Sequence, residues 1–344
     1  MNLTSSPTCQ PVEVQCLRTL TMAALSVAFA VGVVANGLVL WMTAFRMART
    51  VTTTWFFHLA LADFAVLASL PVAIYRLASN EWPFEDSACK LYMAFLAFTF
   101  FTSICLLVLI SVDRCISALY PIWVRNHRTV QRASWLAVGV WLLAAVASSP
   151  YLIFRTTEEQ GGCKYCHFKF DIDNEGQESS YDWEQVIHKR HMAVTITHFV
   201  VGFLVPLVVI STCAHLLRAK LRQEGWVHSS RPKRLLLVLA SAFFILWFPF
   251  NVALLVHLGL RDPHDPNILL ALWATFSLGC LNSCLNPFLY VFVGRNFQEK
   301  FFQSLPSALA RAFGEEGFLI HLVPKGKCPG DAGDLKVEAE NPPV

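Results

Sequence analysis

Residues 89–115 read CKLYMAFLAFTFFTSICLLVLISVDRC, and this stretch decides the fold class. Between Leu91 and Val112 it contains no charged residue, and a helix that crosses the hydrocarbon core of a bilayer needs about 20 such apolar residues. Six further stretches are long and mainly apolar, although several of them carry one or two polar residues. The sequence therefore predicts an all-α membrane protein with seven transmembrane helices, at about residues 20–45, 55–78, 89–115, 133–154, 191–218, 233–260 and 267–293.

The composition agrees with a membrane protein and excludes several other classes. Of the 344 residues, 55% are hydrophobic and 15% are charged, whereas a soluble domain carries about 25% charged residues. The formal net charge of +3 gives a nucleic-acid partner no electrostatic support. The sequence lacks the metalloprotease, serine-hydrolase, dinucleotide and phosphate-loop motifs, and its halves show no repeat of the kind common in transporters. It therefore predicts neither an enzyme nor a transporter.

The connectors between the predicted helices alternate in charge. Those near 46–54, 116–132 and 218–234 are rich in Lys and Arg, whereas the others are acidic. Because basic loops tend to stay in the cytoplasm, the N-terminus is predicted to lie outside the cell and the C-terminus inside. Asn2 in Asn2-Leu3-Thr4 then lies outside, where it is a candidate for glycosylation.

Cysteines on the predicted outer side are candidates for disulfides, which form in oxidising compartments. Cys89 begins the third predicted helix and faces a long loop at about 155–190, which contains Cys163 and Cys166. A bond from Cys89 to either of them would tie the loop across the bundle. A zinc or redox role for the Cys163–Cys166 pair is disfavoured, because no second CxxC or His pair completes such a site.

Polar side chains inside the predicted helices carry a further expectation, because polar groups at membrane depth are costly and often functional. Asp63 lies in the middle of the second helix, and the others are Asn36, Ser103, Asn282 and Asn286. We expect these five residues to meet in one buried cluster that holds water or a small cation. The alternative is a set of interhelical hydrogen bonds without an ion.

Prolines interrupt five of the predicted helices, and each removes one helix hydrogen bond. They are Pro71, Pro150, Pro206, Pro249 and Pro287. Kinked helices around a polar core predict a bundle that changes conformation.

Asp113-Arg114-Cys115 ends the third predicted helix at its cytoplasmic side. We expect Asp113 and Arg114 to form an ion pair, and breaking this pair would free Arg114 for a cytoplasmic partner. The alternative is that Arg114 only extends to the membrane interface.

The order of these motifs resembles that of rhodopsin-like G-protein-coupled receptors. The matching residues are Asn36, Leu59-Ala-Leu-Ala-Asp63, Cys89, Asp113-Arg114-Cys115, Trp141, Pro206, Trp247-Phe-Pro249 and Asn286-Pro-x-x-Tyr290, which together cover about residues 20–311. Each motif alone is weak, but the ordered set is specific. Asp-Arg-Cys in place of Asp-Arg-Tyr is similar to the chemoattractant subgroup that contains the formyl-peptide receptors. The segment 113–137, DRCISALYPIWVRNHRTVQRASWLA, resembles the lipid-sensing, resolvin D1-type branch of that subgroup.

This resemblance implies roles for particular residues. The implied sodium and water site consists of Asp63, Ser103, Asn282 and Asn286, and no other metal or cofactor is implied. The residues implied in G-protein coupling and activation are Asp113, Arg114, Trp247, Pro249, Pro287 and Tyr290. The implied disulfide joins Cys89 to Cys166 and leaves Cys163 for Cys9 or Cys16.

The resemblance also implies a domain organisation. An extracellular N-terminal segment (1–19) precedes the seven-helix receptor domain (20–293), a short amphipathic eighth helix (294–311) and a cytoplasmic tail (312–344). The implied location is the plasma membrane, and the implied partner is a heterotrimeric Gi protein. Arrestin is a further candidate partner, although the chain after Ser307 contains no Ser or Thr to phosphorylate.

A cavity between the outer ends of the helices is the expected ligand site. Its candidate residues are Arg76, Lys90, Leu96, Phe100, His198, Trp247, Phe250, Leu254, His257, Trp273 and Phe276. Most are apolar or aromatic, which suits a fatty chain better than a peptide backbone. A lipid acid also needs a cation for its carboxylate, and Arg76 is the first choice. The predicted ligand is a hydroxylated polyunsaturated fatty acid, a pro-resolving lipid mediator of the resolvin D1 type.

Two departures from the family pattern keep alternatives open. Ala97, Val194 and His198 stand where the formyl-peptide receptors have an Asp and two Arg, which argues against formyl peptides as ligands. Ala214 stands where the family usually has a Tyr that joins Tyr290 through water, which argues against efficient signalling. The alternatives are therefore a receptor for a chemotactic peptide and a signalling-poor decoy receptor.

Overall fold

The computed structural model describes residues 14–160, 162–170, 181–223, 231–259 and 266–293. Within these ranges, the side chains of residues 160, 181–184, 221, 231–240, 266 and 288–293 are not described. The chain divides into two units, 1–298 and 299–344, and all described residues belong to the first. The expectations for Asn2, the eighth helix and the tail therefore fall outside the described residues, as does the side chain of Tyr290.

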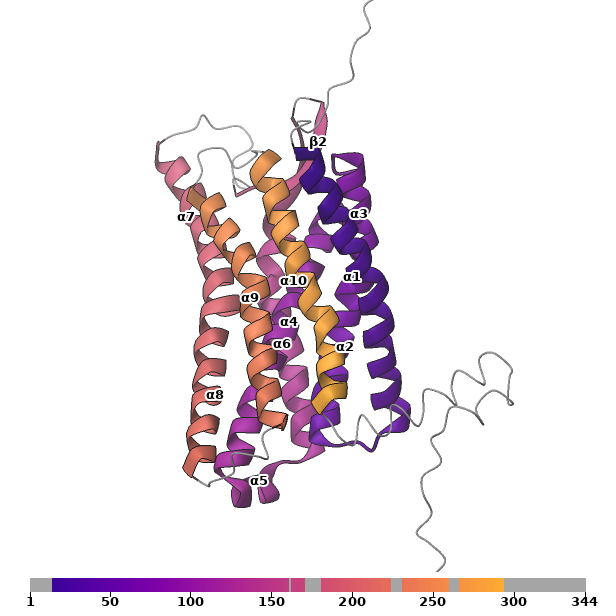
Figure 1. The fold of residues 1–344 in the computed structure, drawn as a ribbon. Coiled ribbons are helices and arrows are strands. Elements are labelled where there is room, and N and C mark those ends of the chain that lie inside the picture. The colour runs from indigo at the N-terminus through magenta and orange to yellow at the C-terminus, as the bar shows by residue number, and fades with distance from the viewer. Residues whose placement is uncertain (1–13, 161, 171–180, 224–230, 260–265, 294–344) are drawn as a thin grey trace, which may run out of the picture. The chain divides into compact units, whose positions relative to one another are not determined.

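Among the described residues, seven helical stretches are long and apolar enough to cross a membrane, and Figure 1 shows them running alongside one another as a bundle. This confirms the predicted fold class. The crossings are, in chain order, α1 (Gln15–Trp41) with the π-helical turn η2 (Met42–Arg46); α2 (Val51–Ala68) with α3 (Leu70–Ser79); α4 (Asp86–Leu119); α6 (Val130–Phe154); α7 (Tyr181–Phe199) with the π-helical turn η3 (Val200–Leu204) and α8 (Val205–Gln223); α9 (Arg231–Gly259); and α10 (Pro266–Val293). The short helix α5 (Pro121–His127) connects α4 to α6.

Helix α4 occupies the centre of the bundle. It packs against α2, α6, α8 and the strand β1 (Arg155–Gln160), and it has the largest buried share of the seven crossings. Helix α6 is at the other extreme, because large apolar side chains such as Trp135 and Val146 are each 70% exposed. Exposed apolar surface of this kind is suited to lipid as the surrounding solvent.

Two of the five prolines lie where the regular α-helix is interrupted, and the other three do not. At Pro71 the second crossing divides at Ser69 into α2 and α3, so that the proline falls in the first turn of α3, where its missing N–H removes no bond. Pro206 is the second residue of α8, which directly follows η3, a local π-helical turn in the fifth crossing. The other three prolines lie inside continuous helices, namely α6, α9 and α10.

A small β-hairpin lies at one end of the bundle. Strand β1 pairs antiparallel with β2 (Cys163–Phe168), with Arg155 opposite Phe168. The sequence analysis predicted only a loop over this region, so the hairpin is an addition to the expected fold. We call this end of the bundle the hairpin end, and the opposite end, where α5 lies (Figure 1), the Arg114 end.

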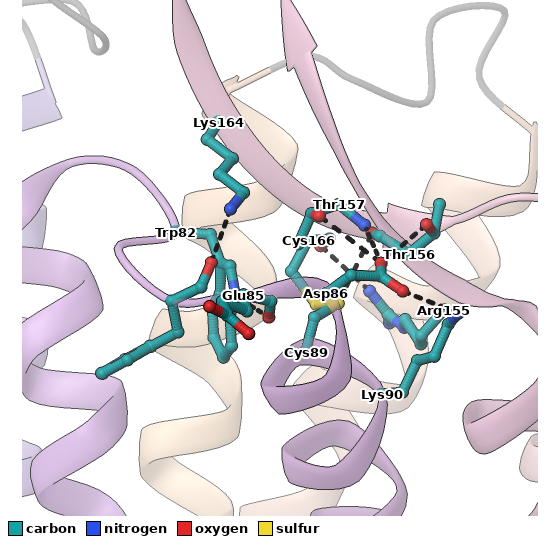
Figure 2. The surroundings of a disulfide bond; sticks show 11 residues. Trp82, Glu85, Asp86, Cys89, Lys90, Arg155, Thr156, Thr157, Lys164 and Cys166 are labelled. Carbon is teal, nitrogen blue, oxygen red and sulfur yellow. Dashed lines mark hydrogen bonds and ion pairs between the residues drawn. A yellow bond between two sulfur atoms is a disulfide. The ribbon is translucent and has the colours of Figure 1, made fainter.

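Two ties hold the hairpin against the first turn of α4 (Figure 2). Cys89 is disulfide-bonded to Cys166, which confirms the predicted pairing. The Asp86 carboxylate accepts hydrogen bonds from the Thr156 hydroxyl and the Thr157 backbone N–H, both at 2.7 Å. Cys163 is also disulfide-bonded, and Cys16 is a free thiol, so Cys16 is excluded as its partner.

Candidate functional site

A cavity of about 130 Å³ lies between the helices at the hairpin end. The hairpin contributes Cys166 and Phe168 to its wall. Most of the predicted ligand contacts line it: Arg76, Leu96, Phe100, His198, Trp247, Phe250, Leu254, Trp273 and Phe276. The walls are therefore mainly apolar and aromatic, as the sequence predicted.

Two of the predicted contacts are not among the lining residues. Lys90 pairs with Asp86 at 2.7 Å on the first turn of α4, and the His257 ring lies 5.5 Å from the His191 ring. Conversely, the sequence analysis did not assign several lining residues to the ligand site: Met93, Tyr151, Arg155, Cys166, Phe168, Leu269 and Leu272. One feature of the sequence could have indicated Arg155 as a cavity residue, because it is a charged residue directly after the fourth apolar stretch, 133–154.

Two arginines give the cavity a positive charge. The Arg76 guanidinium lies over the Trp273 ring at 4.9 Å and that of Arg155 over the Phe168 ring at 3.9 Å, which is cation–π geometry. Neither forms an ion pair with a described residue. Burial lowers the pKa of Arg155 to about 10, so it remains protonated at neutral pH. The cavity therefore presents positive charge that no described acid neutralises.

Trp247, the expected activation switch, packs among aromatic residues of the cavity. Its ring centroid lies 4.7 Å from that of Phe100, 5.6 Å from Phe250 and 6.1 Å from Phe276. Helix α10 approaches it so closely that a Cβ added at Gly279 would come within 2.7 Å of the indole. A ligand in this cavity would therefore contact residues that pack directly on Trp247.

Asp63 forms the centre of a buried polar cluster beyond the cavity. Its carboxylate accepts hydrogen bonds from Ser103 at 3.1 Å, Ser283 at 2.8 Å and Asn286 at 2.7 Å. Of the other four residues expected in this cluster, Ser103 and Asn286 hydrogen-bond Asp63 directly, and Asn36 and Asn282 do not. The Ser283 contact was missed.

The two remaining asparagines have other surroundings. Asn36 donates to the backbone carbonyls of Gly32 and Ser283, both at 3.0 Å, which is an interhelical tie. Asn282 is buried, and its Oδ1 has no hydrogen-bond partner among the described residues. Hard cations are bound by oxygen ligands, so the oxygens that meet at Asp63, Ser103 and Ser283 fit the sodium ion that the resemblance implies. The partnerless Oδ1 of Asn282, the residue before Ser283, is a further candidate ligand.

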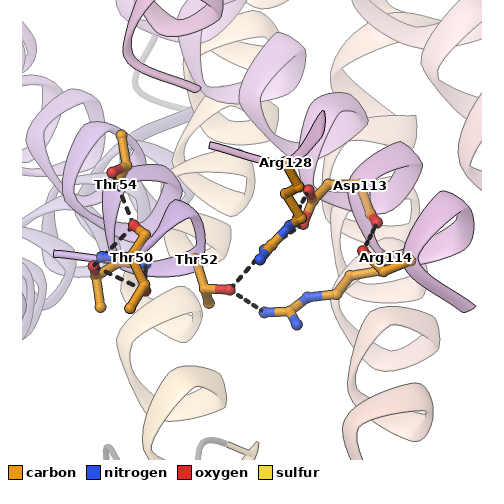
Figure 3. A network of polar contacts seen from close by, with 8 residues as sticks. Thr50, Thr52, Thr54, Asp113, Arg114 and Arg128 are labelled. Atoms are coloured by element: carbon orange, nitrogen blue, oxygen red, sulfur yellow. Dashed lines mark hydrogen bonds and ion pairs between the residues drawn. The ribbon is translucent and has the colours of Figure 1, made fainter. Parts of the chain in front are cut away.

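A second polar network lies at the Arg114 end (Figure 3). The Asp113 carboxylate binds Arg128 through two hydrogen bonds, of 2.7 and 2.9 Å, rather than the expected Arg114. Arg114 donates instead to the Thr52 hydroxyl at 3.2 Å, and Arg128 donates to the same hydroxyl at 3.0 Å. The physical reason is that consecutive residues of a helix point in different directions and do not face each other.

A family model described as 7 transmembrane receptor (rhodopsin family) matches residues 35–290. The chain therefore belongs to the rhodopsin family of seven-transmembrane receptors, and it is a receptor rather than an enzyme. It is 60% identical over 329 residues to the human protein named Probable G-protein coupled receptor 32, covering 94% of this chain and 91% of that protein. N-formyl peptide receptor 2 of Macaca mulatta is 42% identical over 314 residues, covering 87% of each chain. Formyl peptide receptor 2 of Mus musculus is 38% identical over 334 residues, covering 94% of this chain and 90% of that one.

These comparisons confirm the class and subgroup that the sequence motifs predicted. The chain is a membrane-embedded G-protein-coupled receptor of the formyl-peptide-receptor-like group. As a member of this family it has a ligand and a G protein as partners.

Proposed function

We propose that this chain is a plasma-membrane receptor for a hydroxylated polyunsaturated fatty acid, a pro-resolving mediator of the resolvin D1 type, and that it signals through Gi. The observation that carries the proposal is the cavity itself, in which aromatic and aliphatic walls meet the unneutralised guanidinium of Arg76. Burying an alkyl chain against such walls stabilises the complex by about 25 cal/mol per Å². A guanidinium supplies the charge-assisted hydrogen bonds that a carboxylate requires.

The relatives named for formyl peptides suggest a second ligand class, a chemotactic peptide. Ala97 lines the cavity and is only 5% exposed, so this wall offers a methyl group where the formyl-peptide subgroup has a carboxylate. His198, which also lines the cavity, stands where that subgroup has an arginine. These replacements favour the lipid over the peptide.

In the proposed mechanism, the hairpin end faces the outside of the cell and the Arg114 end faces the cytoplasm. The aromatic cage of Trp247 consists of Phe100, Phe250 and Phe276. A ligand that contacts this cage favours one of two arrangements of α9. The ligand shifts the populations of these arrangements only by the difference between its affinities for them. The Gi protein then binds the arrangement in which Arg114 is accessible. Asp63, Ser103 and Ser283 would hold a sodium ion, which would supply a positive charge to the buried carboxylate.

The proposal is tested by inhibition of stimulated cAMP production in cells that express the chain, with and without pertussis toxin. Resolvin D1 is compared with formyl and chemokine-type peptides. A toxin-sensitive response to the lipid alone supports the proposal, and a response to a peptide alone transfers the ligand to the peptide class. Lipid binding without any cAMP response identifies a decoy receptor, with Ala214 as the first residue to restore to Tyr.

A paired variant tests the role of Arg114. Arg114→Ala should abolish the cAMP response and retain lipid binding, because Arg114 lies at the opposite end of the bundle from the cavity. The matched control is Arg125→Ala, which removes an exposed arginine of α5 at the same end. An undiminished Gi response in Arg114→Ala would refute the assigned role.

A further inference from the structure

Three polar side chains of the cavity wall lack partners that their burial would normally require. The Nε of Arg155 and the Nε2 of His198 are buried without a hydrogen-bond partner among the described residues. Arg76 is only 7% exposed, and no hydrogen bond or ion pair joins it to a described residue. Burying polar and charged groups without partners is unfavourable. Since all three residues line one cavity, they indicate where polar groups of the ligand bind.

The two arginines together specify one anionic group. Arg76 comes from α3 and Arg155 from the start of β1, and both guanidinium-bearing side chains line the same cavity. One aromatic ring covers a face of each guanidinium, Trp273 for Arg76 and Phe168 for Arg155. The Nη1 of Arg155 donates to the Cys166 carbonyl at 3.3 Å, whereas its Nε has no partner among the described residues. This Nε and the guanidinium of Arg76 therefore remain for an acceptor. A carboxylate between them would neutralise the mutual repulsion and satisfy the Nε of Arg155.

His198 specifies a different kind of group. Its Nδ1 lies 2.8 Å from the Tyr151 hydroxyl, and its ring stacks on Phe100 at 5.0 Å, so the imidazole is fixed from two sides. If Tyr151 donates to Nδ1, the Nε2 carries a hydrogen and needs an acceptor. If Nδ1 donates to Tyr151, the Nε2 needs a donor. A ligand hydroxyl is both donor and acceptor and satisfies either tautomer.

The backbone sets the spacing between the two kinds of recognition. Tyr151 and Arg155 are four residues apart at the end of α6, which corresponds to about one helical turn, roughly 5 Å along the axis. The Phe168 ring lies 5.3 Å from the Tyr151 ring and 3.9 Å from the Arg155 guanidinium. His198, which is held by Tyr151 at 2.8 Å, therefore lies in the part of the cavity next to Arg155. The hydroxyl it contacts belongs to the carboxyl half of a long acyl chain.

We propose that Arg155 joins Arg76 in binding the ligand carboxylate, and that His198, oriented by Tyr151, selects a ligand that carries a hydroxyl in the carboxyl half of its chain. This inference rests on the proposed function and adds the residues that determine specificity. Two measured ratios define it. The first is potency of the acid over its methyl ester, and the second is potency of the hydroxylated acid over unsubstituted docosahexaenoic acid.

The test measures both ratios for the full-length receptor in the toxin-sensitive cAMP assay, with surface expression checked for each variant. The probes are docosahexaenoic acid, a monohydroxylated form with the hydroxyl in the carboxyl half, the positional isomer with the hydroxyl near the methyl end, and the methyl esters of all three. In the wild type, we expect both ratios to be about tenfold or more. The isomer hydroxylated near the methyl end should show no such gain.

The variants separate the two recognition points. Arg155→Gln should reduce the acid-over-ester ratio towards one and keep the hydroxyl preference, and Arg155→Lys should restore part of it. His198→Phe should remove the hydroxyl preference and keep the acid-over-ester ratio. Tyr151→Phe, which frees the imidazole, should weaken the hydroxyl preference only. Lys90→Gln, the control, removes a cation that is paired with Asp86 outside the cavity and should change neither ratio.

A merely structural role for Arg155 or His198 would lower the potency of all probes alike, without changing the ratios. The inference is overturned if the wild type shows both preferences and Arg155→Gln and His198→Phe retain them. Failure of the proposed function gives a different result, because the wild type would then show no toxin-sensitive response to any of the lipids.

Discussion

Arg128, rather than Arg114, pairs with Asp113, because it binds the Asp113 carboxylate through two hydrogen bonds (Figure 3). Arg114 is thereby left with the neutral Thr52 hydroxyl as its partner. In Arg128→Gln, the partly buried Asp113 loses its counter-charge, and the adjacent Arg114 becomes the nearest replacement. We expect the agonist concentration that gives half-maximal nucleotide exchange on Gi to rise by about fivefold or more, which corresponds to a coupling energy of about 1 kcal/mol.

The charge of Arg128, rather than its shape alone, should account for this effect. Arg128→Lys should keep most of the coupling, and Arg125→Gln, at an exposed position of α5, should behave as the wild type. Unchanged or increased exchange in Arg128→Gln would show that the Asp113–Arg128 pair does not protect Arg114.

Asp63 provides a second prediction at the residue scale. If a sodium ion binds among Asp63, Ser103, Ser283 and the unpartnered Oδ1 of Asn282, replacing choline by sodium should raise the melting temperature of the purified receptor by about 2 °C or more. Asp63→Asn removes the charge and keeps the size, so it should abolish the sodium effect. Potassium is the control ion. A sodium-dependent rise that persists in Asp63→Asn would place the ion elsewhere.

The Asp63 cluster also shows where residue-level prediction fails. The sequence identified Asp63, Ser103 and Asn286 correctly, because polar residues at membrane depth are few and stand out. It chose Asn282 where Ser283 makes the bond. Adjacent residues on a helix differ by about 100° in direction, and the sequence does not reveal how a helix containing Pro287 is rotated about its axis. The expected Asp113–Arg114 pair is wrong for a different reason, because adjacent residues of a helix do not face each other.

At the scale of elements, α9 and α10 meet at a contact that only glycine permits. A Cβ at Gly279 would lie 2.7 Å from the rigid indole of Trp247, so Gly279→Ala must displace the indole or separate the helices. We expect a loss of about 1–3 kcal/mol of stability and an altered basal Gi signal, measured by thermal unfolding in detergent and by cAMP without ligand. Gly139→Ala on α6, where a Cβ would meet nothing within 4 Å, is the control and should be neutral or stabilising. Unchanged stability and basal signal in Gly279→Ala would show that the indole moves freely.

The transmembrane helices can be predicted from local sequence, whereas the hairpin cannot, because it depends on partners that are distant in sequence. A bilayer requires long apolar helices, so hydropathy along the chain is sufficient to find them. Strands β1 and β2 carry polar and charged residues without a clear alternation and are fixed by partners distant in sequence, Cys89 and Asp86. Arg155 was missed with them, because its place in the cavity depends on that hairpin.

At the scale of the whole bundle, the proposed ligand site and the proposed G-protein site lie at opposite ends of α4. This helix has 34 residues and is therefore about 50 Å long. Between the ends lie two compact groups of contacts, the aromatic cage around Trp247 and the hydrogen bonds of Asp63. No single contact spans that distance, so communication requires two arrangements of the bundle that both partners bind with different affinity.

This requirement leads to a reciprocal prediction. If the agonist increases the affinity of the receptor for Gi, then Gi must increase the affinity for the agonist by the same factor, typically about 5–150-fold. In membranes that contain Gi, adding a non-hydrolysable GTP analogue should therefore weaken binding of a radiolabelled agonist lipid. Arg114→Ala should retain lipid binding at the affinity of the uncoupled receptor and show no nucleotide effect, because this variant does not engage Gi. Arg125→Ala should retain the shift. A nucleotide effect that survives in Arg114→Ala would mean that Gi senses the cavity through residues other than Arg114.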